Sequence, residues 1–126
     1  MKTIAIIGAF DTKAEEYHYI IQAIQKQGMS VFTINTGVLG STDLFPVDVE
    51  ADELADAAGA DIKILREEKD RGAAMKIMCT GAASIVKQRF EQHCFDGIFG
   101  MGTSFDALQN AANLFIQMGD QSVVFG

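Results

Sequence analysis

Three polar residues near the N-terminus, Asp11, Thr12 and Lys13, have side chains and a position suited to binding an anion. They follow the apolar run Ile4–Ile7, whose continuous apolar character predicts a strand buried on both faces. Thr12 and Glu15 have the spacing of a capping box, so we predict that Thr12 is the N-cap of a helix and Lys13 its first residue. Helix N-termini favour anions, and the Lys13 ammonium adds a positive charge. The stretch therefore predicts a phosphate-binding site without specifying a reaction.

A second loop with glycines and hydroxyl groups follows a later strand. We expect Gly97–Gly100 to form that strand, and Gly102, Thr103 and Ser104 come directly before a helical pattern. Right-handed crossovers and the usual doubly wound order place this strand beside the first, so both loops meet at one crevice. We predict that Lys13 and the amides near Thr12, Gly102 and Thr103 meet phosphates there. Ser104 and Asp11 would assist, directly or through Mg²⁺, and Gly100 belongs to the same site. Each loop alone is weak support, because many α/β folds use such turns simply to change direction.

Asp11 and Gly37 complete the predicted site. Asp11 could hold Mg²⁺ through water, as carboxylates beside phosphates do, or it could bond its own backbone in a turn. Gly37 follows the second apolar run, Val31–Ile34, and would allow a ligand past the end of that strand. The connection from Gly37 to Val49 is long, which is as typical of a binding loop as of a plain excursion.

The residues that several other kinds of functional site require are not found in this sequence. Neither GxxxxGK nor GxGxxG is present, and Gly100 and Met101 stand where a response regulator would need an acid. Cys79 and Cys94 are far apart, without metal-type spacing or an evident catalytic partner. His18 is more typical of a partly exposed helix residue than of a ligand.

Composition limits the class of protein further. The 126 residues suffice for one domain with a single core, and 48% are hydrophobic. A net charge of -7 argues against general nucleic-acid binding, which depends on Lys and Arg contacts to phosphates. No apolar run is long enough to cross a bilayer, and no signal peptide is evident. We therefore expect a cytoplasmic protein with reduced thiols, no nucleic-acid partner and no membrane partner.

The order of elements predicts an α/β fold. After the first strand, Tyr17, Ile20, Ile21 and Ile24 recur at helical spacing. A short acidic helix is predicted from Asp48 to Ala58. A longer helical stretch is predicted from near Asp61 to about Gln92, loosening around Lys69–Gly72. Strands are predicted at Ile4–Ile7, Val31–Ile34, Gly97–Gly100 and Ser122–Gly126. We expect an open doubly wound parallel sheet of about four strands with helices on both faces, Rossmann- or flavodoxin-like.

The long helical stretch is unusually slim, because Gly72 and Gly81 lie among several alanines. Glycine inside a helix costs roughly 1 kcal/mol relative to alanine, so another element should approach closely there. Tight packing of the helix on the sheet and a helix-to-helix contact between two subunits are equally good explanations. The second would make the protein a homodimer.

The sequence also resembles a known family over nearly its whole length. The similar segments are Gly8–Glu16, Thr36–Gly40, Ala57–Gly59, Asp70–Ala74, Gly81–Ala83 and Asp96–Gly102. They resemble the tomato mosaic virus resistance protein-like ATP-binding family. The resemblance implies an N-terminal nucleotide-binding domain, ATP as ligand, a following C-terminal domain and frequent dimerisation. Residues 1–126 would then be a single α/β domain of a longer two-domain architecture, completed by a C-terminal domain or a separate subunit.

The chain departs from that family after the third predicted strand. Members have a Gly-Gly-Ser-Gly-Gly run there, whereas this chain keeps Gly102 and Ser104 but has Thr103, Phe105 and Asp106. We predict an ATP-like nucleotide-binding domain, which could use Mg²⁺, without self-sufficient catalysis. An interaction or oligomerisation module with a degenerate ligand site is the alternative, favoured by Phe105, Asp106 and the slim helix. A hydrolase or transferase half-site completed by another domain is a third possibility.

Overall fold

The computed structural model describes residues 2–67, 71–100 and 123–125 of the chain. Its centre is a parallel sheet of four strands in the order β2-β1-β3-β4. The strands are β1 Thr3–Gly8, β2 Ser30–Asn35, β3 Gly97–Gly100 and β4 Val123–Phe125. Because β3 pairs with β1 on the side away from β2, the predicted doubly wound order is confirmed.

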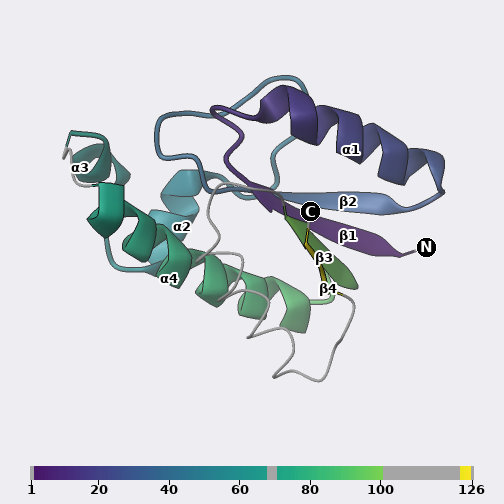
Figure 1. Cartoon of the computed structure of the whole chain (residues 1–126). Coiled ribbons are helices and arrows are strands. Elements are labelled where there is room, and N and C mark those ends of the chain that lie inside the picture. Colours follow the sequence, from purple (N-terminus) through teal and green to yellow (C-terminus); the bar gives the residue numbers. More distant parts are fainter. Residues whose placement is uncertain (1, 68–70, 101–122, 126) are drawn as a thin grey trace.

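Helices cover both faces of this sheet, as Figure 1 shows. The helix α1, Ala14–Lys26, lies on one face. On the other face lie α2, Ala51–Ala57, and α4, Arg71–Glu91, with α3, Ile62–Glu67, at the far end of that layer. Helical structure in the predicted stretch is thus confirmed for α3 and α4, and the predicted loosening around Lys69–Gly72 falls largely outside the described residues.

The strand β1 supplies both layers of the core. Ala5 and Ile7 pack with Val86 and other buried residues on the α4 side. Ile6 packs with Tyr17 on the α1 side. Alternate residues of a strand point to opposite faces, so a strand covered on both faces needs apolar residues throughout. The run Ile4–Ile7 is continuously apolar because β1 is covered by helices on both faces.

The start of α1 differs from the prediction. Its N-cap is Lys13, no side chain caps it, and Ala14 is the first helical residue. The amides of Thr12 and Lys13 both point back to the carbonyl of Ala9, at 3.4 and 3.0 Å. Residues 9–13 therefore form a turn of their own before the helix. The predicted capping box with Thr12 as N-cap is wrong because Thr12 lies inside this turn.

The start of α2 also differs, because residues 48 and 49 belong to the edge of the sheet. Val49 forms a parallel bridge with Ile34, and its amide donates to the carbonyl of Thr33 at 2.9 Å. Asp48 accepts a hydrogen bond from the Thr33 amide at 2.8 Å. The helix begins only at Ala51, after Glu50 as N-cap.

The slim part of α4 packs on α2 of the same chain. A side-chain carbon at Gly81 would collide with the backbone carbonyl of Leu54, which lies in α2. The predicted packing of this part of the helix on the sheet is therefore wrong at Gly81, which faces α2, whereas a contact between two subunits stays a prediction. No helix in the part of the chain that the structure describes has the length and apolar character needed to span a bilayer.

Candidate functional site

The loops that follow β1 and β2 meet at the carboxyl edge of the sheet. Register places Ile7 opposite both Ile34 and Gly100, so the ends of the three strands are level. The amide of Thr36 donates to the carbonyl of Gly8 at 2.8 Å, which extends the pairing by one bond. Open α/β sheets bind ligands outside this edge. A ligand-binding site is therefore expected at this edge.

Asn35, the last residue of β2, fastens the two loops together. Its side chain is fully buried. The oxygen Oδ1 accepts hydrogen bonds from the amides of Phe10 at 3.1 Å and Gly37 at 2.8 Å. The nitrogen Nδ2 donates to the carbonyl of Gly40 at 2.8 Å and to Oε1 of Glu50 at 3.1 Å. This fills the bonding capacity of the amide. Sequence reasoning missed Asn35, although a polar amide ending an apolar strand was a signal.

The structure brings together two of the predicted site residues, Asp11 and Gly37. A side-chain carbon at Gly37 would collide with the Asp11 carboxylate, so the glycine accommodates Asp11. Oδ2 of Asp11 accepts a hydrogen bond from the Leu39 amide at 3.1 Å. Oδ1 is buried and has no hydrogen-bond partner among the described residues. A buried carboxylate oxygen without a partner costs free energy, so it calls for an explanation.

Thr12 and Lys13 lie at the start of α1, beside Asp11 in the chain. Thr12 is exposed and Lys13 is half-buried. Both amides are used within the turn of residues 9–13, as described above, and are not directed to a ligand. The Lys13 ammonium makes no ion pair with any other residue in the described ranges. Among the described residues of this loop, the Lys13 ammonium is therefore a positively charged group that could bind an anion.

The second predicted loop is only partly described. Gly100 is buried at the end of β3, next to β1, as expected. Gly102, Thr103 and Ser104, like Phe105 and Asp106, lie outside the described residues. Their proposed contacts with phosphate stay predictions. No group of three or more potential metal-binding side chains occurs within residues 2–67, 71–100 and 123–125.

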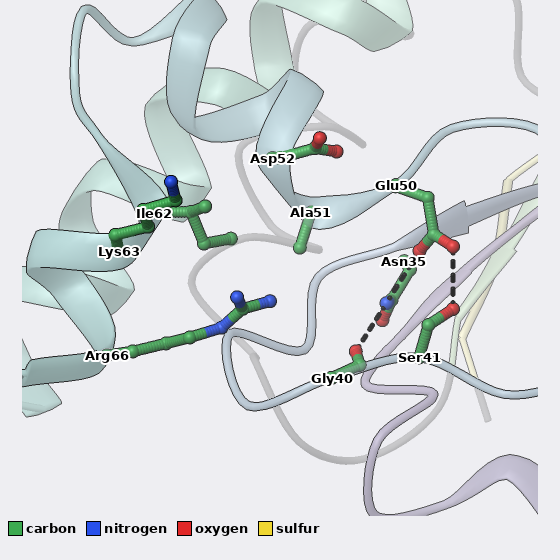
Figure 2. Close-up of a pocket in the computed structure, with 9 residues that line it drawn as sticks. All are labelled: Asn35, Gly40, Ser41, Glu50, Ala51, Asp52, Ile62, Lys63 and Arg66. Carbon is green, nitrogen blue, oxygen red and sulfur yellow. Dashed lines mark hydrogen bonds between the residues drawn. The ribbon is translucent and has the colours of Figure 1, made fainter.

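A cavity of about 350 Å³ opens at the end of β2, between the long loop, α2 and α3 (Figure 2). Asn35 lies at its β2 side, and Ser41 and Glu50 line it from the loop. The Ser41 hydroxyl donates to Oε2 of Glu50 at 2.7 Å. From α3, Arg66 donates its Nε–H to the carbonyl of Val38 at 2.6 Å. Sequence reasoning missed this cavity, because its walls are far apart in the sequence and only the tertiary fold joins them.

Solved structures share this fold. The C-terminal domain of a hydrogenase from Pyrococcus furiosus superposes with a TM-score of 0.72, over 98% of this chain and 89% of that domain. A second structure of the same domain gives a TM-score of 0.71. Sequence identity is 19% in both cases, so the likeness concerns the fold alone.

Curated relatives are more similar in sequence. A UPF0261 protein of Clostridium tetani is 39% identical over 103 residues, which are 82% of this chain and 25% of that protein. A UPF0261 protein of Brucella suis is 30% identical over 101 residues, which are 80% of this chain and 24% of that protein. One of Mesorhizobium japonicum is 31% identical over 102 residues, which are 81% of this chain and 25% of that protein. The chain thus spans about a quarter of the length of these relatives.

A family model also matches the chain, over residues 2–118, and it describes the N-terminal domain of the uncharacterised protein family UPF0261. This match and the relatives overturn the resemblance to the tomato mosaic virus resistance protein-like ATP-binding family, which was the wrong assignment. The chain belongs to the uncharacterised protein family UPF0261 and corresponds to its N-terminal domain.

Proposed function

We propose that this domain binds a nucleotide at the carboxyl edge of its sheet, with phosphates beside Lys13 and Mg²⁺ beside Asp11. The observation that carries the proposal is the buried Oδ1 of Asp11, which lacks a partner among the described residues. Carboxylates beside phosphates commonly hold Mg²⁺, directly or through water. A magnesium nucleotide would thus supply both the cation that Asp11 lacks and the anion that Lys13 lacks.

Binding at Asp11 requires a small local movement. Oδ1 is covered in the free protein, and Gly37 is the residue packed against the carboxylate. One hydrogen bond, from the Leu39 amide, ties Oδ2 to the long loop. Breaking that single bond would uncover the carboxylate, at a net cost of about 1 kcal/mol. Such a cost is small against the binding free energy of a nucleotide held at micromolar affinity, about 8 kcal/mol.

The alternative of an interaction module loses one of its supports. Gly81 of α4 is in contact with α2, so it no longer favours a contact between subunits. A homodimer, a C-terminal domain or separate subunit as partner, and a cytoplasmic location remain proposals. No disulfide joins Cys79 and Cys94, which is consistent with a reducing compartment. Catalysis would be a property of the longer relatives, of which this chain spans a quarter.

Calorimetric titration with ATP, ADP and AMP, with and without Mg²⁺, tests the proposal. Lys13→Met should weaken ATP binding by roughly tenfold or more, because a charged hydrogen bond contributes about 1.5–3 kcal/mol. Lys26→Met is the matched control, since Lys26 is exposed at the other end of the same helix. Equal affinity of both variants would remove Lys13 from the site.

Asp11→Asn tests the magnesium part separately. The variant keeps an oxygen for the Leu39 amide but loses the negative charge. We expect ATP affinity without Mg²⁺ to be unchanged or improved, and the gain on adding Mg²⁺ to disappear. A Mg²⁺ effect of the same size in both proteins would show that Asp11 does not contact the ion.

A further inference from the structure

We infer that the cavity at the end of β2 is a separate site for a small monocarboxylic acid that carries hydroxyl groups, with Arg66 as its anchor. No residue of the proposed nucleotide site lines this cavity. The backbone of the long loop, at Gly40 and Ser41, forms one of its walls. The inference therefore stands or falls independently of nucleotide binding.

Arg66 is exposed, one hydrogen bond orients its side chain, and its charge is not neutralised. The hydrogen bond from Nε to the carbonyl of Val38 holds the guanidinium against the long loop. Figure 2 shows the two terminal amino groups extending from α3 toward Gly40 and Ala51. Within the described ranges, no carboxylate lies within 4.0 Å of Arg66 to form an ion pair. A guanidinium fork of this kind matches the two oxygens of a carboxylate or phosphate.

The acidic residues of the cavity select against high negative charge. Both carboxylate oxygens of Glu50 already accept hydrogen bonds, from Asn35 and Ser41. Asp52 lines the same cavity, and Lys63 lies one turn before Arg66 on α3. Two cations and two anions therefore surround the space. A ligand with one negative charge is favoured over a phosphate dianion or a polyphosphate, which the two carboxylates repel.

The volume and the lining of the cavity further limit the class of ligand that it can bind. A volume of about 350 Å³ is at the lower end for ligand sites, so it fits a small metabolite. Buried Ala51 and Ile62 give the cavity an apolar wall for a short carbon chain. Glu50 and the carbonyl of Gly40 keep lone pairs that accept hydrogen bonds from hydroxyl groups.

Nuclear magnetic resonance of the isotope-labelled chain tests this inference with glycerate as probe, at constant ionic strength. We expect saturable shifts of the Arg66 Nε–H signal and of the Ser41 and Lys63 amides. Glycerol, which lacks the carboxylate, should give none. Arg66→Gln should weaken glycerate binding roughly tenfold or more, and Arg66→Lys, which keeps the charge but not the fork, should weaken it less. Lys87→Gln, an exposed change on α4 outside the cavity, should bind like the unchanged protein.

Several results would overturn the inference. Absence of saturable shifts with glycerate, or equal binding by Arg66→Gln, would rule out this anchor. Tighter binding of inorganic phosphate at the same signals would exclude a monocarboxylic acid as the ligand class. Displacement of glycerate by ATP would make the cavity part of the nucleotide site. Failure of ATP to bind anywhere would reject the proposed nucleotide function but leave the glycerate result standing.

Discussion

The loop after β1 and the cavity at the end of β2 lie at one edge of the sheet, and the Asn35 side chain forms hydrogen bonds in both regions. They differ in the group that lacks a partner, which is an anion, Asp11, in the loop and a cation, Arg66, in the cavity. Asp11 in the loop has a buried oxygen that accepts no hydrogen bond from the described residues. Arg66 in the cavity has a guanidinium that faces no carboxylate within ion-pair distance in the described ranges. The two proposals above therefore assign a cation to Asp11 and an anion to Arg66 at the same edge. The side chain that lacks a partner in each region, not the position of the region on the fold, is what each proposal rests on.

The most severe change should be Gly81→Leu, which acts on the cavity side alone. The new side chain would collide with the Leu54 carbonyl and push α2, the helix that carries Ala51 and Asp52, away from α4. We expect a loss of about 4 kcal/mol or more, measured by denaturant unfolding. Ser84→Leu, at an exposed position of the same helix, is the control. A folded Gly81→Leu protein that changed from dimer to monomer would revive the subunit contact.

Asn35→Ala should affect both regions together. Its four hydrogen bonds would be lost, and buried amides of Phe10 and Gly37 would be left without an acceptor. We expect destabilisation of about 3 kcal/mol. Asn35→Asp keeps the acceptor but sets a buried carboxylate oxygen against the Gly40 carbonyl and Glu50, so it should cost at least as much. A loss under 1 kcal/mol for the alanine variant would mean that the loops do not depend on this amide.

Gly37→Ala should affect the loop after β1 and spare the cavity. The methyl group would displace the Asp11 carboxylate, with an expected loss of about 1–2 kcal/mol. Gly40 gives a matched control, because a side-chain carbon there would meet no atom of the described structure within 4 Å. Thermal unfolding of Gly37→Ala and Gly40→Ala should therefore differ clearly. Equal melting temperatures would show that Asp11 moves freely.

Thr12→Ala should have the smallest effect. The sequence pattern predicts a cap, whose loss costs about 1 kcal/mol, but the Thr12 side chain caps nothing in the structure. We therefore expect a change within about 0.5 kcal/mol, as for an ordinary exposed position. A loss near 1 kcal/mol in chemical denaturation would restore the capping box.

The sequence was a good guide to the fold because the fold depends on local patterns and general rules. Apolar runs marked the strands, and the handedness of crossovers gave the position of β3 beside β1. The predicted starts of α1 and α2 were wrong. The amides of Thr12 and Lys13 donate to the carbonyl of Ala9, and those of Asp48 and Val49 donate to the carbonyl of Thr33, so these residues lie outside the helices. That competition depends on three-dimensional placement.

The candidate site was less predictable. The strand order placed Asp11 and Gly37 at one edge of the sheet, since parallel strands end there, but their contact was not predicted. The role of Asn35 and the place of Arg66 did not follow. Arg66 contacts the Val38 carbonyl only because the long loop and α3 fold onto the same end of β2. No local pattern specifies such a contact.

The carboxylate of Asp48 has a consequence for how this protein behaves in a crowded solution. It takes the place of a neighbouring strand by accepting the Thr33 amide, and the Val49 carbonyl does the same for the Asn35 amide at 2.8 Å. Exposed strand edges are templates on which other chains pair and aggregate. The long loop therefore also acts as an edge guard, closing the carboxyl half of β2 to strand addition by another copy of the chain.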